Sequence, residues 1–546
     1  MKKLFYLKKR GFTLIELLAV IVILAIILLI AMPIVLNVIQ DARKGAFETT
    51  AMGLVKTAEN ECLTSLLTGP VIEREVVFSD YQMNDETLTF SGKGPKEGVI
   101  HINSNCEVAM AIYDESWCVI KEFSETSLTI TNYDGNCQIN EVITNPETPE
   151  EYIAAGYIPI STPDELNNIR YSVANTFGEG TDWEGTYTGG IDKKYFQTND
   201  IDLDVAPYNQ NTGWEPIGRD GVTNRTGWYY GGVVFTGVYD GNDYYINNLL
   251  IDLPEDPGDY EWDVAFFYYL GEEGIIRNLK LGDFAITATY SISSIVIYNE
   301  GLVENIFVKG SLTALETHVG EIGGIVYNNK PTGIVRNGAA DIYVSGGQSL
   351  HSIGGIVSHN DGLIEMSKSK GQILHSNYPE RSGGIASYNN GSISQCFSEL
   401  YINGIYQFGG GLAGQNKGEI INSYATGIVR GRNDIGGFVG SILTSSSFIS
   451  NSYSKGPVQI SGTGSNRGGF IGSDYGSGNI IENSYWDITT SGFATSAGGV
   501  GRNTADMIYP YNQENTYIGW DFENIWAIDS LINGGYPYLR NNLPFN

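Results

Sequence analysis

Three carboxylates alternate with apolar side chains in one short stretch of the chain. Asp200, Asp202 and Asp204 lie two residues apart, and in a β-strand that spacing places all three on one face. Oxygen ligands of this kind suit Ca²⁺, and paired carboxylates can also cleave sugars. We favour a simpler interpretation, an exposed polar face opposite a buried apolar one. No cofactor is therefore expected, with calcium at these three residues as the alternative.

Other catalytic arrangements find little support in the sequence. The chain has five histidines, which are too few and too scattered for a Ser-His-Asp or Cys-His group. A polysaccharide lyase also needs basic residues near its acids, and only Lys193 and Lys194 precede the three aspartates closely. We therefore expect no enzymatic activity, with a polysaccharide lyase or hydrolase as the alternative.

Aromatic side chains are concentrated between residues 183 and 262. Exposed aromatic rings stack on sugars or anchor protein interfaces, so this group is a candidate ligand-binding surface. The same rings could equally close the end of a repeat array, because terminal repeats need capping. The residues concerned are Trp183, Trp214, Trp228, Tyr229, Tyr230, Tyr244, Tyr245 and Trp262.

Four of the five cysteines fall in one stretch, at Cys62, Cys106, Cys118 and Cys137, and Cys396 stands alone. This distribution fits an oxidising compartment outside the cytoplasm. Four cysteines allow three pairings, and the sequence does not choose among them. Reduced, buried cysteines are the alternative, and no spacing among them resembles a zinc site.

The composition limits both fold class and partners. The chain has 546 residues, 62 acids and 32 bases, for a formal net charge of −30. Such a negative chain repels phosphate backbones, so no nucleic-acid partner is expected. Its 68 glycines and 35 tyrosines favour short strands joined by tight turns. The length allows two to four domains.

The amino terminus combines a basic cluster with a long apolar run. Residues 1–10 contain five bases and no acid, and residues 17–36 carry no charge. A helix of that length reaches roughly 30 Å, enough to cross the hydrocarbon core of a bilayer. The basic cluster should stay on the cytoplasmic side. Glu16 lies at the edge of this helix, and an acid at membrane depth calls for a partner.

Residues 8–36 resemble the type IV prepilin leader, written here Lys-Lys-Arg-Gly-Phe-Thr-Leu-Ile-Glu. The resemblance implies that a prepilin peptidase cuts between Gly11 and Phe12 and methylates the new amine of Phe12. It also implies that Glu16 neutralises the amino terminus of a neighbouring subunit during assembly, and that Pro33 bends the helix as in that family. The alternative is an ordinary single-pass membrane anchor.

The same resemblance divides the first part of the chain. Residues 1–11 would be the leader, residues 12–68 the pilin helix with its apolar part at 12–36, and residues 69–140 a small globular head. Pilins often close a carboxyl-terminal loop of the head with a disulfide. Cys118 and Cys137 bracket a loop that such a disulfide would close. Residues 141–160 are acidic and carry three prolines, which is typical of a linker.

Two anchors recur about every 30 residues in the remainder of the chain. One is Ile or Val, any residue and then Asn, as in Ile276–Asn278, and the other is a Gly-Gly pair followed by an apolar residue. A unit this short cannot bury its apolar face alone, so stacked copies are expected to form a parallel β-helix. We expect the recurrent Asn to form an internal ladder of amides. Cys396 occupies a repeat position and is expected to be a buried filler rather than a reactive thiol.

These units resemble the GLUG repeat of large bacterial surface proteins and adhesins. The resemblance implies amino-terminal coils or a cap over residues 161–270, repeats over 271–503 and a carboxyl-terminal cap over 504–546. A β-propeller is the main rival, but its blades need four strands in roughly 40–45 residues.

The predicted fold is thus a long amino-terminal α-helix with a small α+β pilin head, followed by an all-β right-handed parallel β-helix. The predicted function is that of a minor type IV pilus subunit and adhesin that binds glycans or surface proteins. Its expected partners are other pilin subunits, the prepilin peptidase and that ligand. It would pass through the cytoplasmic membrane as a single-pass protein before reaching the cell-surface pilus. The alternatives are a surface-displayed polysaccharide-degrading enzyme and a pseudopilin of a secretion or DNA-uptake apparatus.

Overall fold

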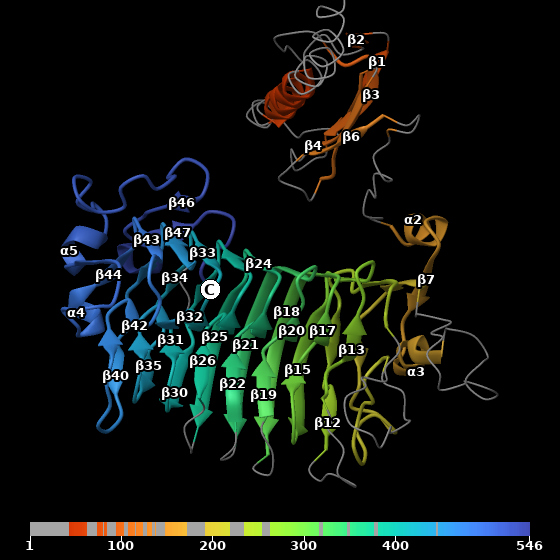
Figure 1. The fold of residues 1–546 in the computed structure, drawn as a ribbon. Coiled ribbons are helices and arrows are strands. Elements are labelled where there is room, and N and C mark those ends of the chain that lie inside the picture. The colour runs from red at the N-terminus through yellow and green to blue at the C-terminus, as the bar shows by residue number, and fades with distance from the viewer. Residues whose placement is uncertain are drawn as a thin grey trace, which may run out of the picture. The chain divides into compact units, whose positions relative to one another are not determined.

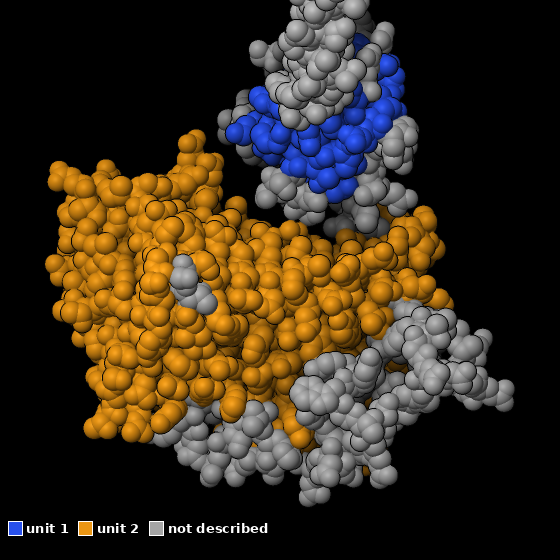
Figure 2. Space-filling view, viewed as in Figure 1, with its two compact units in different colours: residues 1–147 blue, residues 148–546 orange. Residues whose placement is uncertain are grey.

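A computed structural model gives the arrangement of most of the chain. The described residues are 43–59, 61–62, 74–79, 81–83, 94–102, 108–114, 116–123, 128–133, 137, 148–171, 192–218, 234–253, 263–315, 320–346, 350–375, 380–443 and 446–545. They form two compact units, Met1–Glu147 and Thr148–Asn546 (Figure 2). Each unit is described by itself below.

In the first unit, a helix packs on an antiparallel sheet. Residues 43–59 and 61–62 are helical, and the helix buries Phe47, Ala51 and Leu54 in a core shared with the sheet. Their spacing of three and four residues places them on one side of the helix. The rest of the predicted pilin helix lies outside the described residues.

The sheet of the first unit has the strand order β2-β1-β3-β4-β5-β6. Apolar side chains of its central strands, including Ile100 and Met110, complete the core under the helix. The strands are β1 (Arg74–Ser79), β2 (Gln82–Met83), β3 (Glu97–Ile102), β4 (Val108–Tyr113), β5 (Trp117–Lys121) and β6 (Thr129–Asn132).

The second unit is a β-solenoid built from three parallel sheets, as the repeats predict (Figure 1). Each turn of the chain adds one strand to an eight-stranded sheet and nearly always one to a seven-stranded sheet. The eight strands are β13 (Phe267–Leu270), β17 (Val296–Asn299), β20 (Val326–Asn329), β23 (Val357–Asn360), β27 (Ala386–Asn389), β32 (Ala413–Asn416), β37 (Val439–Ile442) and β42 (Ile471–Asp474). The seven are β16 (Ile292–Ser293), β19 (Gly320–Gly323), β22 (Leu350–Gly354), β26 (Arg381–Gly383), β31 (Gly409–Gly410), β36 (Ile435–Gly436) and β41 (Arg467–Gly468).

The third sheet has 24 strands because each turn contributes one long strand or two to three short ones. Its strands are β7 (Tyr157–Ile160), β8 (Lys194–Gln197), β9 (Ile201–Asp202), β10 (Val238–Asp240), β11 (Tyr245–Asn247), β12 (Leu250–Asp252), β14 (Ile275–Arg277), β15 (Lys280–Ala288), β18 (Leu302–Ala314), β21 (Ile334–Gly346), β24 (Leu363–Glu365), β25 (Lys368–His375), β28 (Ser392–Ser394), β29 (Phe397–Ser398), β30 (Tyr401–Ile405), β33 (Glu419–Ile421), β34 (Tyr424–Ala425), β35 (Val429–Gly431), β38 (Phe448–Ser450), β39 (Tyr453–Ser454), β40 (Val458–Ile460), β43 (Ile480–Glu482), β44 (Tyr485–Asp487) and β45 (Val500–Arg502).

The solenoid begins earlier than the sequence suggests. Helix α2 (Pro149–Ala154) follows a capping box at Thr148, and β7 then pairs in parallel with β8. The buried Tyr152 hydroxyl donates to Asp240 Oδ2 at 3.1 Å. Residues 148–160 of the predicted linker are therefore the first part of the second unit, because their apolar side chains complete its end.

Short helices lie at the two ends of the described solenoid. Helix α3 (Pro163–Asn168) has a capping box at Thr162 and runs into η1 (Ile169–Tyr171). Helix α4 (Ile488–Ser491) is capped by Asp487, whose carboxylate accepts from two backbone amides. The remaining elements are α5 (Thr504–Met507), β46 (Trp526–Ala527), η2 (Asn533–Gly535) and β47 (Tyr538–Leu539).

The Gly-Gly pairs mark places where successive turns touch through their backbones. A Cβ built on Gly324 would overlap the carbonyl oxygen of Gly355, and one on Gly355 would overlap that of Gly384. The preceding Gly323 is blocked in the same way by the carbonyl of Val326. Only glycine fits here, so this recurring pair is a steric requirement of the stacking.

The asparagines of the Ile-x-Asn anchor are not internal, in contrast to the prediction. Asn278, Asn305 and Asn337 have φ values of 52°, 53° and 50°, so each turns the chain in the left-handed region that asparagine tolerates. Asn305 Nδ2 donates to Asn278 Oδ1 at 3.1 Å, and Asn337 Nδ2 to Asn305 Oδ1 at 2.8 Å. These side chains are partly or fully exposed, so their ladder runs along the outside of a corner.

A second set of asparagines forms the internal ladder. Each ends a strand of the eight-stranded sheet and is fully buried. The first four donate from Nδ2 to Oδ1 of the next asparagine at 2.7–2.8 Å, and the last donates to Ser447 Oγ. The amides also donate to backbone carbonyls at the turn, as from Asn329 Nδ2 to Gly333 O at 3.1 Å. We call this set the asparagine ladder; it consists of Asn299, Asn329, Asn360, Asn389 and Asn416.

Cys396 is a buried filler, as expected, and its neighbours explain why a cysteine fits at this position. It lies in a column with Ser367, Ser423 and Ser452, in which the amide of one turn donates to the side chain of the next. Ser367 N donates to Cys396 Sγ at 3.4 Å, and Cys396 N donates to Ser423 Oγ at 3.1 Å. The thiol is free and buried, and its burial raises the pKa of Cys396 to about 12. A thiol with so high a pKa is unreactive at neutral pH.

Residues 504–545, predicted to cap the end of the solenoid, also run back along its side. Asn542 Nδ2 donates to Ser367 O at 3.2 Å and to Gln395 O at 3.0 Å, several turns from the carboxyl-terminal end. Trp520 Nε1 donates to Asn483 O at 2.8 Å near that end. We call residues 504–545 the cover segment.

Beneath the cover segment lies a row of rings that point out of the solenoid. Phe397 and Tyr424 stack with centroids 4.7 Å apart, and Tyr424 and Tyr453 stack at 5.1 Å. Tyr485 follows in register with Tyr453. We call these four residues the aromatic stack. All four are buried together with Trp520, Trp526 and other apolar residues of the cover segment.

Candidate binding site on the cover segment

The residues predicted to be processed or to drive assembly cannot be placed. Gly11, Phe12, Glu16 and Pro33 all lie outside the described residues. Among the described residues, no helix has the length and apolarity needed to cross a membrane, and the apolar run at 17–36 is outside them. The support for these four residues therefore comes from sequence.

The described members of the predicted aromatic group are divided between surface and core. Tyr244 and Tyr245 are each 36% exposed. Trp214 is 2% exposed and belongs to the solenoid core, where it packs on Phe266 with centroids 5.5 Å apart. The guanidinium of Arg170 lies 5.2 Å from its ring. Trp214 is therefore a core residue, and the prediction that it contacts ligand is wrong. Outside the described residues lie Trp183, Trp228, Tyr229, Tyr230 and Trp262.

The three aspartates are exposed, but backbone and amide groups already occupy their carboxylates. Asp200 Oδ1 accepts from Tyr245 N at 2.8 Å. Asp202 Oδ1 accepts from Asn248 Nδ2 at 2.8 Å and from Asp204 N at 2.9 Å. Both bonds lower the pKa of Asp202, and the bond from Asn248 has the larger effect. In the described part of the chain, no three acids, histidines or cysteines gather in a way that could hold a metal ion. The hydrogen bonds of Asp200 and Asp202 link neighbouring turns of the chain.

Two of the four clustered cysteines are joined to each other. Cys118 and Cys137 form a disulfide with a Cα–Cα distance of 5.6 Å, which is the loop that the pilin resemblance suggests. Cys62 is also disulfide-bonded; its partner lies outside the described residues, as does Cys106. The first unit is therefore covalently braced, consistent with an oxidising compartment.

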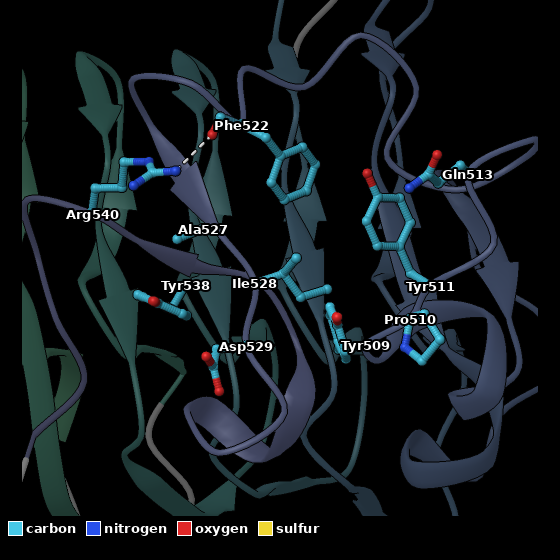
Figure 3. Close-up of a pocket in the computed structure, with 10 residues that line it drawn as sticks. All are labelled: Tyr509, Pro510, Tyr511, Gln513, Phe522, Ala527, Ile528, Asp529, Tyr538 and Arg540. Atoms are coloured by element: carbon cyan, nitrogen blue, oxygen red, sulfur yellow. Dashed lines mark hydrogen bonds between the residues drawn. The ribbon is translucent and has the colours of Figure 1, made fainter.

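The cover segment carries a hollow that sequence reasoning did not identify. Its volume is about 450 Å³, and Figure 3 shows side chains from two stretches, 509–513 and 522–540, around it. The lining is Tyr509, Pro510, Tyr511, Gln513, Phe522, Ala527, Ile528, Asp529, Tyr538 and Arg540. The signal available in the sequence was the density of aromatic residues after residue 504.

The backbone around this hollow is fixed by the strands below it. Strand β46 pairs antiparallel with β47, and Arg540 Nε donates to Trp526 O at 2.9 Å. Arg540 also donates from an Nη to Phe522 O at 2.8 Å, the bond drawn in Figure 3. The floor is thus built from the buried side of the cover segment, while its rim faces solvent.

The lining combines ring faces with polar groups. Tyr511 and Phe522 lie with centroids 5.4 Å apart and nearly parallel, and Tyr509 is 55% exposed. Gln513 and Asp529 are exposed beside them. Aromatic faces stack on the C–H faces of sugars, while amide and carboxylate groups bond hydroxyls. We call this set of residues the cover pocket; its chemistry suits a neutral glycan.

The cover pocket does not contain a pair of acids suited to hydrolysis. Among the described residues that line it, Asp529 is the one carboxylate, and it already accepts from Leu531 N at 2.8 Å. Glycoside hydrolysis by the usual route uses two carboxyl groups that face one bond. The arrangement therefore suits binding better than cleavage.

A second aromatic row lies on the eight-stranded sheet, but its polar groups are engaged within the protein. Tyr298 and Tyr327 lie with centroids 5.9 Å apart, and their hydroxyls donate to Asp263 and Glu321 at 2.8 Å each. Burial, reinforced by these acids, raises the pKa of both tyrosines. This row stabilises adjacent turns.

Comparison with known proteins supports the amino-terminal assignment. The model of the prokaryotic N-terminal methylation motif matches residues 6–32, as in a type IV pilin-like amino terminus. The match covers a small part of the chain and concerns that part alone. No curated protein matches the chain.

Two solved structures resemble the chain weakly. One, assigned as an immunoglobulin A1 protease from Bacteroides ovatus, has 17% identity and a TM-score of 0.31, over 70% of this chain and 92% of that one. The other, an IgA1 protease, has 13% identity and a TM-score of 0.31, over 76% of this chain and 28% of that one. At these scores, neither carries an argument about function.

Proposed function

We propose that this chain is a type IV pilin-like subunit that displays a β-solenoid adhesin at the cell surface. The observation that carries the proposal is the methylation motif at residues 6–32 on a chain whose second unit is a solenoid. The motif supplies a route to processing and assembly. The solenoid, whose repeats resemble those of GLUG-type surface proteins, supplies the displayed module.

In this proposal the amino-terminal segment has three partners. A prepilin peptidase cleaves after Gly11 and methylates Phe12, and the apolar helix rests in the cytoplasmic membrane before assembly. Glu16 then pairs with the amino terminus of a neighbouring pilin subunit. The large solenoid suits a minor subunit, because such an appendage on every copy would crowd a filament.

We propose the cover pocket as the ligand-binding site, with a glycan as ligand and no turnover. The support is its pair of near-parallel rings, its exposed polar groups and its single carboxylate. The net charge of −30 disfavours polyanions, including nucleic acids, and favours neutral ligands.

The assembly part is tested by sequencing the amino terminus of the protein recovered from the cell surface. We expect it to begin at an N-methylated Phe12. A surface protein that still begins at Met1 would overturn the proposal. Glu16→Ala should leave this processing intact and remove the protein from sheared filaments, since the charge pair is needed for assembly and not for cleavage.

The binding part is tested with the full-length chain on an array of neutral glycans. Tyr511→Ala, which removes one face of the ring pair, should lower the affinity for the best glycan at least tenfold. The matched control is Tyr343→Ala, because Tyr343 is 46% exposed on β21 and does not line the pocket. Equal loss in both variants, or release of cleaved sugar, would count against a binding pocket.

A further inference from the structure

Lys455 follows strand β39 and extends beneath the cover segment. Its Nζ donates to the backbone oxygen of Asn533 at 2.7 Å and to the carboxamide oxygen of the same residue at 2.8 Å. Nζ also lies 4.5 Å from the ring centre of Tyr536. The amine is therefore positioned against one carboxamide, 78 residues away in the sequence.

The carboxamide of Asn533 is held on its other side as well. Its Nδ2 donates to Tyr453 Oη at 2.6 Å and to Pro537 O at 2.7 Å. Because the carbonyl of Pro537 can only accept, it fixes the nitrogen on that side and leaves the oxygen toward the lysine. The amide plane is thus fixed, with its carbon held next to the amine.

The surroundings favour the neutral, nucleophilic form of the amine. Burial lowers the pKa of Lys455 to about 8, so roughly a tenth of the amine is uncharged at neutral pH. Two acids oppose this shift, and Glu399, whose own pKa is raised by burial, has a larger effect than Asp487. The buried rings of Tyr453, Trp520 and Trp526 limit access of water.

We propose that Lys455 and Asn533 join through an intramolecular amide cross-link between Nζ and Cγ. The neutral amine attacks Cγ and forms the Nζ–Cγ bond, and the Cγ–Nδ2 bond then breaks. Nδ2 leaves as ammonia with the proton that Nζ gives up, so the reaction needs no oxidant and no second substrate. The link joins the cover segment covalently to the coil that it covers, independently of which ligand the protein binds.

The intact mass of the reduced full-length protein tests the cross-link. We expect the folded protein to be lighter than its sequence by about 17 Da, the mass of ammonia, and a tryptic peptide with Asn533 to remain attached to one with an uncleaved Lys455. Lys455→Arg keeps the charge and the hydrogen-bond donors but should show the full mass and no linked peptide. Asn533→Asp should lose about 18 Da instead, because water would then leave.

Two outcomes overturn the proposal. One is the full sequence mass for the folded wild-type protein. The other is a loss of about 17 Da that persists in Lys455→Arg, because Asn533 precedes Gly534 and a succinimide there also releases ammonia. The matched control is Lys368→Arg. Lys368 Nζ donates to the backbone oxygen of Leu543 at 2.9 Å, so it also contacts the cover segment but through a backbone carbonyl, and this variant should keep the loss.

Discussion

The asparagine ladder and the aromatic stack repeat along the same turns, but they depend on the rest of the chain differently. Each ladder amide is satisfied by the next copy of itself and by nearby turn carbonyls. In the aromatic stack, Tyr424 lies between Phe397 and Tyr453, and the rings still have edges that only the cover segment buries. An apolar edge in water is unfavourable, so the stack requires a cover that the repeat cannot supply.

This difference separates what a repeat can stabilise from what it cannot. A ladder is complete wherever two copies meet, and its contribution grows with each added turn. The stack needs residues 504–545, which occur once and have no repeat pattern. The following predictions test that division.

The largest effect is expected where the cover segment meets the stack. Trp526 is fully buried, with its ring centroid 4.4 Å from Trp520 and 6.0 Å from Tyr424. Trp526→Ala should lower the free energy of unfolding of the cover by about 4 kcal/mol. Protease should then cut residues 504–545 first, while hydrogen exchange in the asparagine ladder stays slow. Tyr509→Ala, an exposed change on the same segment, should cost less than about 0.5 kcal/mol.

A smaller effect is expected inside the ladder. Asn360 accepts from Asn329 Nδ2 at 2.8 Å and donates to Asn389 Oδ1 at 2.7 Å. Asn360→Ala leaves buried partners unsatisfied and should destabilise the solenoid by about 3 kcal/mol in chemical denaturation. Asn337→Ala, at the exposed corner, should cost about 1 kcal/mol, mainly through its left-handed backbone. Equal destabilisation by Asn360→Ala and Asn337→Ala would contradict the distinction between the buried asparagine ladder and the exposed corner asparagines.

Alkaline pH should separate the two regions without mutation. Burial raises the pKa of Tyr424, Tyr453 and Tyr517 well above the ordinary value, and in the unfolded chain these groups ionise near pH 10. The stability that these buried tyrosines give the folded state is fully present below that pH. It decreases as the pH rises above it, by roughly 0.8 kcal/mol for each tyrosine at pH 10.5. Tryptophan fluorescence should report loosening of the cover before ladder amides exchange. If the fluorescence change and the exchange of the ladder amides occurred at the same pH, the cover segment and the asparagine ladder would unfold together.

The smallest effect is expected at Cys396. Serine occupies the neighbouring positions of its column and accepts the same backbone bond, so Cys396→Ser should change the free energy of unfolding by less than about 1 kcal/mol. Cys396→Val is the contrasting variant, because it leaves the amide of Ser367 without its acceptor and should cost about 2 kcal/mol. Thermal unfolding of both variants makes the comparison.

The sequence indicated the solenoid but assigned the ladder to the wrong asparagines. Ile-x-Asn was the more visible pattern, yet Asn305 and Asn337 lie outside because their positive φ turns the chain at a corner. Asn329 and Asn360 each lie five residues after the second glycine of a pair. That spacing was present in the sequence, but which side faces inward depends on where each strand bends.

The binding site was harder to predict for a related reason. Trp214 is of a residue type that often contacts ligands, but it is buried in the core. The type of a side chain does not reveal its exposure. The cover pocket depends on Tyr511 and Phe522 meeting across a fold of the cover segment. No periodicity marks that segment, so its path could not be read from the sequence.

The sequence by itself determined the methylation motif, the repeat length, the glycine pairs and the acidic charge, because each follows from residues close together in the chain. The tertiary structure alone decided which asparagines are buried, that the last 40 or so residues cover a side of the solenoid, and that Lys455 faces Asn533. Those facts depend on contacts between residues far apart in sequence. Such contacts are set by how successive turns stack, and local residue preferences do not encode that stacking.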